Sequence, residues 1–117
     1  MARFTRRQRL THPAQFKRVF AAPERFGDRW MTVLARPNGL AQPRLGLAVG
    51  RRKIARATQR NMFKRVVRES FRTRQDELAG YDVVVLPKRA AASADRGQLR
   101  ASIDRQWNLL ARRARHG

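Results

Sequence analysis

Residues 60–72, RNMFKRVVRESFR, separate into an apolar side and a basic side when they are drawn as a helix with about 100° per residue. The apolar side carries Phe63, Val66, Val67, Ser70 and Phe71. The basic side carries Asn61, Lys64, Arg65, Arg68 and Arg72, and Glu69 is the only acid in the segment. An ordinary solvated helix surface mixes acids among its basic residues. The segment therefore favours a helix that is buried along one side and meets an anionic partner along the other.

This predicted helix has sequence signals at both ends. Thr58 is a plausible N-cap, because its hydroxyl can accept a hydrogen bond from an N–H group of the first turn. Leu78 continues the apolar stripe, and Ala79-Gly80 is a natural end because glycine adopts the left-handed conformation found after a last turn. We expect one helix of about 20 residues, or about 30 Å.

The composition indicates one domain with a nucleic-acid partner. The chain has 117 residues, 42% of them hydrophobic, a formal net charge of +20 and a pI of about 12.0. An excess of positive charge on this scale is typical of proteins that bind nucleic acid. We expect a single domain over residues 1–117, with residues 1–10 as a flexible basic arm.

The sequence gives no sign of a membrane partner. We find no run of about 18 apolar residues that could span a bilayer. The first residues, MARFTRRQRL, lack the apolar core of a signal peptide, and no lipidation motif is present. We expect a cytoplasmic protein.

Side chains for catalysis or metal binding are scarce. The chain has no cysteine, and its two histidines, His12 and His116, lie near opposite ends. The eight acids are scattered, without the pairing that acid–base catalysis or a two-metal site needs. We therefore predict no catalytic residue and no metal site in the protein, and a stand-alone nuclease is disfavoured.

A short helix is predicted near the start of the chain. Thr11-His12-Pro13 is typical of a helix start, with Thr11 as N-cap, and Ala22-Pro23 ends it. Phe16, Val19 and Phe20 form a narrow apolar stripe. Spacing alone favours a core role for both phenylalanines, and the alternative is that one ring stays partly open to stack on an unpaired base.

The middle of the chain is typical of strands. Residues 29–36 read as a strand, with a weaker one at 24–26 joined to it across Gly27-Asp28. Residues 44–50 alternate, so that Leu45, Leu47 and Val49 belong in a core. The opposite side is small (Gly46, Ala48 and Gly50) and permits close approach by a packed helix or by a ligand backbone. We favour the packed helix.

The remaining elements complete a strand–helix–strand unit. Residues 81–86, YDVVVL, are almost continuously apolar, as in a strand buried on both faces. A crossover helix makes its two flanking strands parallel neighbours. Residues 88–97 read as a loop, and a last helix over 95–113 carries a stripe of Leu99, Ile103, Trp107 and Leu110. We predict an α+β domain with helices packed on a small sheet.

Several segments together resemble the protein subunit of bacterial ribonuclease P. They are RLGLAVGRRK (44–53), RNMFKR (60–65), Arg68-Glu69 with Phe71, the Phe16–Val19–Phe20 stripe and the strand 81–86. The resemblance covers at least residues 4–113. One position departs from the family pattern, because Met62 stands where the family usually has arginine. The contact of that arginine is not carried over to this chain.

The resemblance implies a fold and a function. The fold would be a two-layer α/β sandwich, with a small mixed sheet of about four strands, three helices and the order αβββαβα. Its β-α-β crossover would be left-handed, against the roughly 98% right-handed rule. The chain would be the non-catalytic protein component of an endoribonuclease ribonucleoprotein that removes the 5′ leader of precursor tRNA. Catalysis with Mg²⁺ would lie in the RNA subunit.

The resemblance also assigns site residues to a single RNA-binding domain. Residues that would bind the catalytic RNA subunit are Arg60, Asn61, Lys64, Arg65 and Arg68 on the helix, and Arg51, Arg52, Lys53 and Arg56 in the loop before it. Residues that would bind the precursor tRNA leader are Phe16, Lys17 and Phe20.

Two other binding functions are compatible with the charge. A ribosomal or other structural RNA-binding protein, without a role in tRNA processing, could have the same fold and composition. A DNA-binding regulator could use residues 60–72 as a recognition helix, but that motif needs a supporting helix just before it. Residues 51–57 instead follow a predicted strand, so we do not expect a DNA partner.

Overall fold

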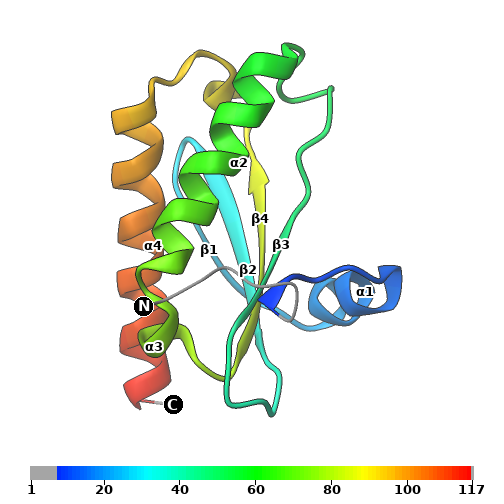
Figure 1. Ribbon diagram of the computed structural model, residues 1–117, viewed down its shortest axis with the longest axis vertical. Coiled ribbons are helices and arrows are strands. Elements are labelled where there is room, and N and C mark those ends of the chain that lie inside the picture. Colours follow the sequence, from blue (N-terminus) through cyan, green and yellow to red (C-terminus); the bar gives the residue numbers. More distant parts are fainter. Residues whose placement is uncertain (1–7, 117) are drawn as a thin grey trace.

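The computed structural model describes residues 8–116, with side chains described through residue 114, and shows helices packed on both faces of one sheet (Figure 1). The elements are α1 (Pro13–Ala21), β1 (Glu24–Gly27), β2 (Met31–Pro37), β3 (Arg44–Leu47), α2 (Ala57–Arg72), α3 (Gln75–Leu78), β4 (Tyr81–Pro87), the 3₁₀ helix η2 (Arg89–Ser93) and α4 (Arg96–His116). The predicted α+β class is confirmed. The short helix α3 is an addition to the predicted order, which becomes αβββααβα.

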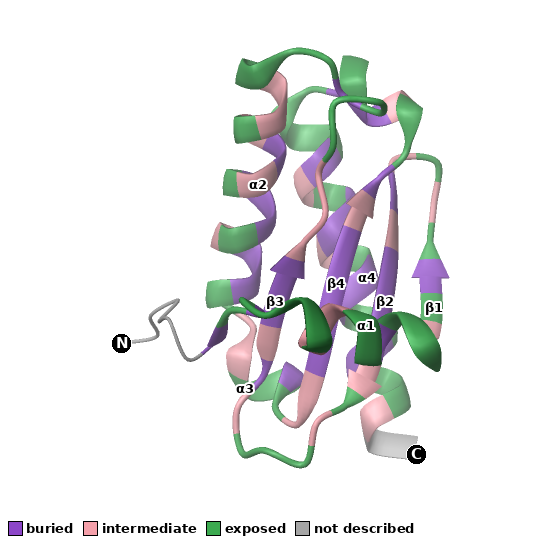
Figure 2. Cartoon of the chain, turned by 90° about the vertical axis from the view of Figure 1, so that its right-hand side faces the viewer, coloured by how far each residue is buried: buried purple, intermediate pink, exposed green. Residues whose placement is uncertain are grey.

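The sheet is mixed and has the strand order β1-β2-β4-β3. β1 pairs with β2, and β2 with β4, in antiparallel fashion, while β3 and β4 are parallel neighbours, as predicted. In Figure 2, β3 and β4 both point upward, β4 lies to the right of β3, and α2 runs behind the sheet. This path from β3 through α2 to β4 is left-handed, the hand that the resemblance implied.

Two helices cover one face of the sheet and one covers the other (Figures 1 and 2). α2 and α4 bury the main core, and both predicted apolar stripes are confirmed. The fully buried members of these stripes are Phe63, Val67, Phe71, Leu99, Ile103, Trp107 and Leu110. On the opposite face, Val19 of α1 packs with Leu10, Leu34 and Val84 in a smaller cluster.

A buried polar contact fixes α2 against α4. The Ser70 hydroxyl accepts a hydrogen bond from Trp107 Nε1 at 2.9 Å and donates one to Asp104 Oδ1 at 2.5 Å. Beside it, the Phe71 and Trp107 rings meet edge to face, 5.9 Å between centroids. Because buried polar groups tolerate few alternative arrangements, this contact sets the rotation of α2 and leaves its basic side facing outward.

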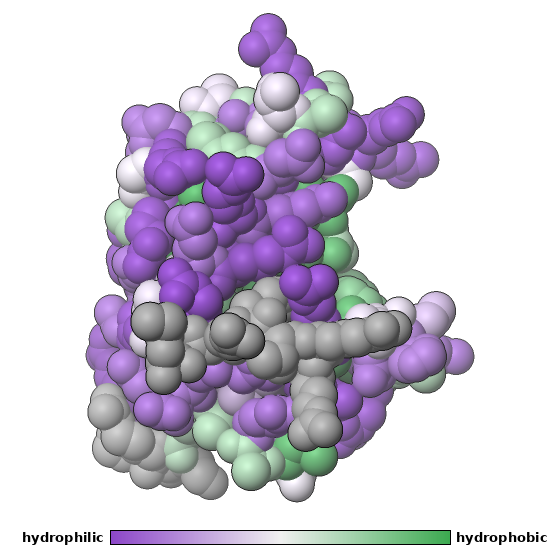
Figure 3. Space-filling view, in the orientation of Figure 1, coloured by the Kyte–Doolittle hydropathy of each residue, from purple (hydrophilic) through white to green (hydrophobic). Residues whose placement is uncertain are grey.

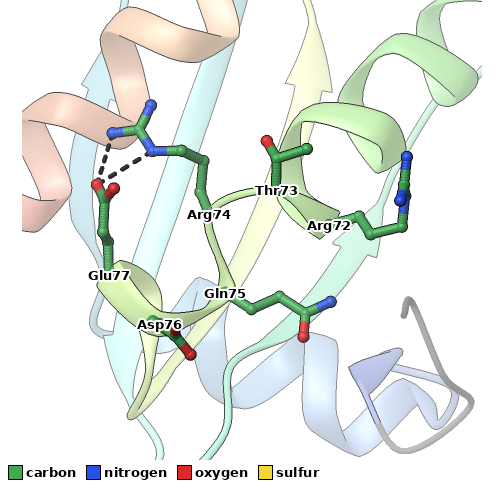
Figure 4. Close-up of a pocket in the computed structure, with 6 residues that line it drawn as sticks. All are labelled: Arg72, Thr73, Arg74, Gln75, Asp76 and Glu77. Atoms are coloured by element: carbon green, nitrogen blue, oxygen red, sulfur yellow. Dashed lines mark hydrogen bonds and ion pairs between the residues drawn. The ribbon is translucent and has the colours of Figure 1, made fainter. Parts of the chain in front are cut away.

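The predicted single helix through Leu78 is wrong. α2 ends at Arg72, and α3 begins at Gln75 after a break at Thr73-Arg74 (Figure 4). The Thr73 N–H and hydroxyl both donate to the Ser70 carbonyl, which closes the last turn with a short i→i+3 bond. The Arg74 guanidinium then bonds Glu77 Oε2 at 2.7 Å and Asn108 Oδ1, anchoring the break to α4.

Both predicted N-caps are also wrong. α2 begins at Ala57 with Arg56 in the cap position, so Thr58 lies inside the first turn. α1 has His12 as its N-cap in place of Thr11. There the Gln15 side chain accepts hydrogen bonds from the Thr11 and His12 N–H groups, at 2.7 and 3.0 Å, and this sets the start of the helix one residue later.

Two further boundaries differ from the prediction. β3 ends at Leu47, although the Ala48 N–H still donates to the Val85 carbonyl, because the chain then turns away and Ile54 N–H bonds the Gly50 carbonyl. The predicted loop 88–97 contains η2. Gln59 of α2 holds η2 in place, because its Nε2 donates to the carbonyls of Ala91 and Ala94, at 2.8 Å each.

Part of the predicted N-terminal arm contacts the sheet. Arg9 forms a parallel bridge with Leu45, and the Leu10 N–H donates to the Leu45 carbonyl at 3.0 Å. Leu10 is buried beneath α1. Residues 1–7 of that arm lie outside the described residues.

Candidate nucleic-acid interface

The outward side of α2 forms a row of basic side chains. Asn61, Arg65, Arg68 and Arg72 are exposed and Lys64 is half-buried, while the opposite side of the helix is buried (Figure 2). Figure 3 shows the hydrophilic side chains that gather over this part of the molecule. We call these five residues the basic face. Since an α-helix is stiff, it holds these groups at fixed spacing.

Acidic side chains neutralise other parts of the molecule but not the basic face. Ion pairs join Arg113 to Glu24, Arg105 to Asp28, Arg74 to Glu77, Arg44 to Asp82 and Arg100 to Asp104. Within residues 8–114, the cations of the basic face form no hydrogen bond or ion pair. Uncompensated cations on one helix create a positive field that favours a polyanion at this surface.

The loop before α2 adds more positive charge. Its predicted binding residues, Arg51, Arg52, Lys53 and Arg56, are all exposed. The buried Ile54 side chain anchors this loop to the core. Arg60 holds it from the other side, because its Nη1 donates to the Ile54 and Ala55 carbonyls, at 2.9 and 2.7 Å. Arg60 is thus the one predicted site residue on α2 whose guanidinium is used inside the described chain.

A cleft lies between α1 and β3, next to the basic face. Side chains of Leu45 and Leu47 line it together with Phe16 and Arg68, and its volume is about 150 Å³. Figure 3 shows the outline recessed above α1, with hydrophobic side chains along the recess. Arg68 therefore lies both on the basic face and at the edge of this cleft.

The structure answers whether the phenylalanines of α1 are core residues. A Cβ built on Gly46 would lie 2.6 Å from the Phe16 ring, so the favoured explanation of the small-residue strand, a packed helix, is confirmed at this position. Phe16 is half-buried, whereas Phe20 is 45% exposed and Lys17 is exposed. Phe20 is thus available as a stacking surface, and Phe16 is a wall of the cleft.

Arg9 lines the cleft together with the predicted site residues Phe16 and Arg68, whereas Lys17 and Phe20 are not among the residues that line it. The guanidinium groups of Arg9 and Arg68 are near enough that burial and the charge of Arg9 together lower the pKa of Arg68. The sequence held no signal for this placement, because the bridge between Arg9 and Leu45 links residues far apart in the chain.

The described residues contain neither a metal-binding cluster nor a membrane-spanning helix. Residues 8–114 hold no cluster of three or more His, Asp or Glu side chains that could bind a metal ion. In the same part of the chain no helix is long and apolar enough to cross a membrane.

Comparison with known proteins gives consistent matches. A family model described as Ribonuclease P matches residues 4–111. The chain is 47% identical over 110 residues to the ribonuclease P protein component of Methylococcus capsulatus, covering 94% of this chain and 86% of the relative. It is 45% identical over 112 residues to that of Photobacterium profundum, covering 96% and 95%.

Solved structures agree with these matches. The ribonuclease P protein of Thermotoga maritima is 33% identical, with a TM-score of 0.73, and covers 89% of this chain and 96% of that one. That of Staphylococcus aureus, at 23% identity, has a TM-score of 0.80 over 87% and 94% of the two chains and supports the fold alone.

Proposed function

This chain belongs to the ribonuclease P protein family, the protein component of the endoribonuclease ribonucleoprotein that matures the 5′ end of tRNA, and on that premise we propose that its basic face binds the catalytic RNA subunit. The observation that carries the proposal is the row of cations on α2 that form no ion pair within residues 8–114. Guanidinium groups bind phosphates through paired hydrogen bonds. A stiff helix presents them at spacings that a folded RNA can match.

The loop residues extend the same surface. We propose that Arg51, Arg52, Lys53 and Arg56 bind phosphates of the RNA subunit beside α2. Arg60 supports this contact by holding the loop through the Ile54 and Ala55 carbonyls. Asn61 is exposed between the loop and Lys64, where its amide can fix a neighbouring RNA group.

The cleft beside α1 suits the single-stranded leader of precursor tRNA. We propose that Lys17 attracts leader phosphates and that Phe20, 45% exposed, stacks on an unpaired base. Phe16 forms the wall against which the chain lies. Stacking and phosphate attraction do not depend on base identity, so such a site accepts leaders of different sequence.

The chemistry of cleavage belongs to the RNA in this proposal. Mg²⁺ would be held mainly by RNA phosphates, and the protein would add positive field and position the substrate. The whole chain, residues 1–117, would act as one RNA-binding domain in the cytoplasm.

Leader removal at low Mg²⁺ tests the function. We expect the protein to raise the rate at which the RNA subunit removes the leader from precursor tRNA. A rate equal to that of the RNA subunit alone would favour the alternative of a structural RNA-binding protein without a role in tRNA processing.

Alanine substitutions test the basic face. Lys64→Ala and Arg68→Ala are expected to weaken binding of the RNA subunit and to reduce the salt dependence of log K by up to about one unit each. Arg112→Ala is the matched control, because Arg112 is exposed on α4 and forms no ion pair within the described residues. If all three variants lost the same amount of affinity for the RNA subunit, the RNA would not bind specifically at the basic face.

The leader site needs a separate measurement. Phe20→Ala should weaken the binding of precursor tRNA that carries a leader about fivefold or more, because one stacking contact is lost. The binding of mature tRNA should be unchanged. Leu109→Ala is the control, since Leu109 is a comparably exposed apolar residue (39%) on α4. A melting curve of each variant separates lost contact from lost stability.

A further inference from the structure

Between α2 and the start of α4 lies a small hollow that shares Asn61 and Arg65 with the basic face. Its lining residues are Thr58, Asn61, Met62, Arg65 and Arg96. Its volume is about 230 Å³, below the roughly 300–1,000 Å³ of pockets for drug-sized ligands. A hollow of this size suits one planar group.

Met62 gives the hollow an apolar floor. Its side chain is half-buried and packs against the main core, so it is held in place from below. A thioether is polarisable and makes favourable contacts with aromatic rings. On α2, Met62 lies between the basic face and the buried side of the helix, and it lines the hollow there.

The rim of the hollow is polar and free to bind. Thr58 and Asn61 are exposed, and neither side chain forms a hydrogen bond within residues 8–114. They offer a hydroxyl and an amide, groups that bind the edge of a base. Arg65 and Arg96 stand beside them without an ion pair in that same region.

Arg96 comes from a different element, α4, and hydrogen bonds on its neighbours anchor the backbone there. It is the first residue of α4, directly after Asp95, whose Oδ1 accepts the Gln98 N–H at 2.7 Å. Gln59 of α2 also donates to the Ala94 carbonyl at 2.8 Å, which ties the start of α4 to α2. A cation in a first turn opposes the helix dipole, so helix stability does not account for arginine at this position.

We infer that this hollow binds one unpaired nucleotide of the RNA subunit, with the base on Met62 and the adjoining phosphates on Arg65 and Arg96. The inference rests on the proposed function of α2 and names the kind of RNA element that the helix meets. An unpaired base has a flat apolar face, a polar edge and two anionic neighbours, which match the floor, the rim and the two arginines. Paired bases in an RNA helix do not expose that face.

Binding of the RNA subunit to variants gives the first test. Arg96→Ala should weaken binding several-fold and lower the salt slope by up to about one unit, because one phosphate contact is lost. Asn61→Ala and Met62→Ala should weaken binding with the slope unchanged. Asn61→Ala keeps the test valid if Met62→Ala is unstable. Arg112→Ala is the charge-matched control for Arg96→Ala, because both arginines lie on α4.

Chemical modification of the RNA bases gives the second test. In the parent complex one unpaired base should gain protection from a base-specific reagent. That protection should disappear with Met62→Ala or Asn61→Ala at saturating protein and remain with Arg112→Ala. If Lys64→Ala weakens binding while Arg96→Ala, Asn61→Ala and the protection pattern match the parent, the nucleotide site is refuted and the proposed function stands. If Lys64→Ala has no effect either, the proposed function fails as well.

Discussion

At the scale of single residues, Gly46 shows how one missing side chain shapes the candidate leader site. Its backbone meets the Phe16 ring so closely that a built Cβ would lie 2.6 Å from a ring atom and 3.0 Å from Leu10. The Phe16 ring can therefore lie this close to the β3 backbone because residue 46 is glycine.

Gly46→Ala should destabilise the protein by about 1–3 kcal/mol, the usual cost of overpacking, and displace α1. Urea denaturation measures the change. Gly50→Ala is the control, since nothing lies within 4 Å of its built Cβ. Equal stability of the two variants would show that α1 packs less tightly than the structure indicates.

Asp28 fixes the turn between β1 and β2 against α4. Burial opposes its ionisation, but the Ser102 hydroxyl (2.5 Å), the Trp30 and Met31 N–H groups and Arg105 donate to the carboxylate and hold the pKa of Asp28 below its ordinary value. A depressed folded-state pKa adds stability above the unfolded pKa of about 3.9. That stability is lost as the pH falls through the folded value.

Asp28→Asn is therefore expected to lower the unfolding free energy by about 1–2 kcal/mol at pH 7. The difference from the parent should shrink as the pH falls below about 4. Urea denaturation at several pH values measures both effects. Asp76→Asn is the control, since Asp76 is exposed and forms no ion pair within residues 8–114. A difference that is independent of pH would contradict the assigned hydrogen bonds.

At the scale of elements, α2 combines two tasks on neighbouring residues. The Ser70–Asp104–Trp107 contact locks its buried side to α4. Its outward side is free for binding except at Arg60, which holds the preceding loop. Arg60 and Arg65 are both arginines of one helix, yet within residues 8–114 only the first contributes hydrogen bonds to the fold.

This difference predicts that two similar substitutions change the stability to different extents. Arg60→Ala should lower the unfolding free energy by about 1–2 kcal/mol through its two lost bonds to carbonyl groups. Arg65→Ala should stay within about 0.5 kcal/mol of the parent, as is usual for an exposed side chain. Urea denaturation compares them, and equal stabilities would show that the Arg60 bonds contribute nothing in solution.

At the scale of the whole molecule, charge dominates. A net charge of +20 on 117 residues makes the isolated fold repel itself. Two ion pairs, Arg113–Glu24 and Arg105–Asp28, tie α4 to β1 and the turn after it, and Arg44–Asp82 joins β3 to β4. The basic face and the loop before it lack such partners within the described residues, so the repulsion is concentrated where the RNA is proposed to bind.

Anions should therefore stabilise the free protein by mass action. At matched ionic strength, the melting temperature should be higher in sulfate than in chloride. The unfolding free energy should rise by as much as about 2.7 kcal/mol when sulfate is present at 100 times its Kd. The double variant Lys64→Ala with Arg68→Ala should gain less. Equal melting temperatures in the two salts would contradict a native anion-binding surface.

Local patterns in the sequence were sufficient for the main elements and for the basic face. The two sides of residues 60–72 and the buried stripe of the last helix follow from side-chain periodicity, and the parallel strands on either side of α2 follow from the strand–helix–strand order. Periodicity is readable from sequence because it depends on residues only a few positions apart.

Contacts between distant residues decided the rest. The end of α2 at Arg72, the position of Arg9 beside Arg68, the seating of Phe16 on Gly46 and the meeting of Met62 with Arg96 each join segments that no local pattern connects. The left hand of the crossover belongs with them, because sheet geometry alone favours the opposite hand. The sequence thus determined which side of α2 is basic, and packing determined which hollows lie beside it.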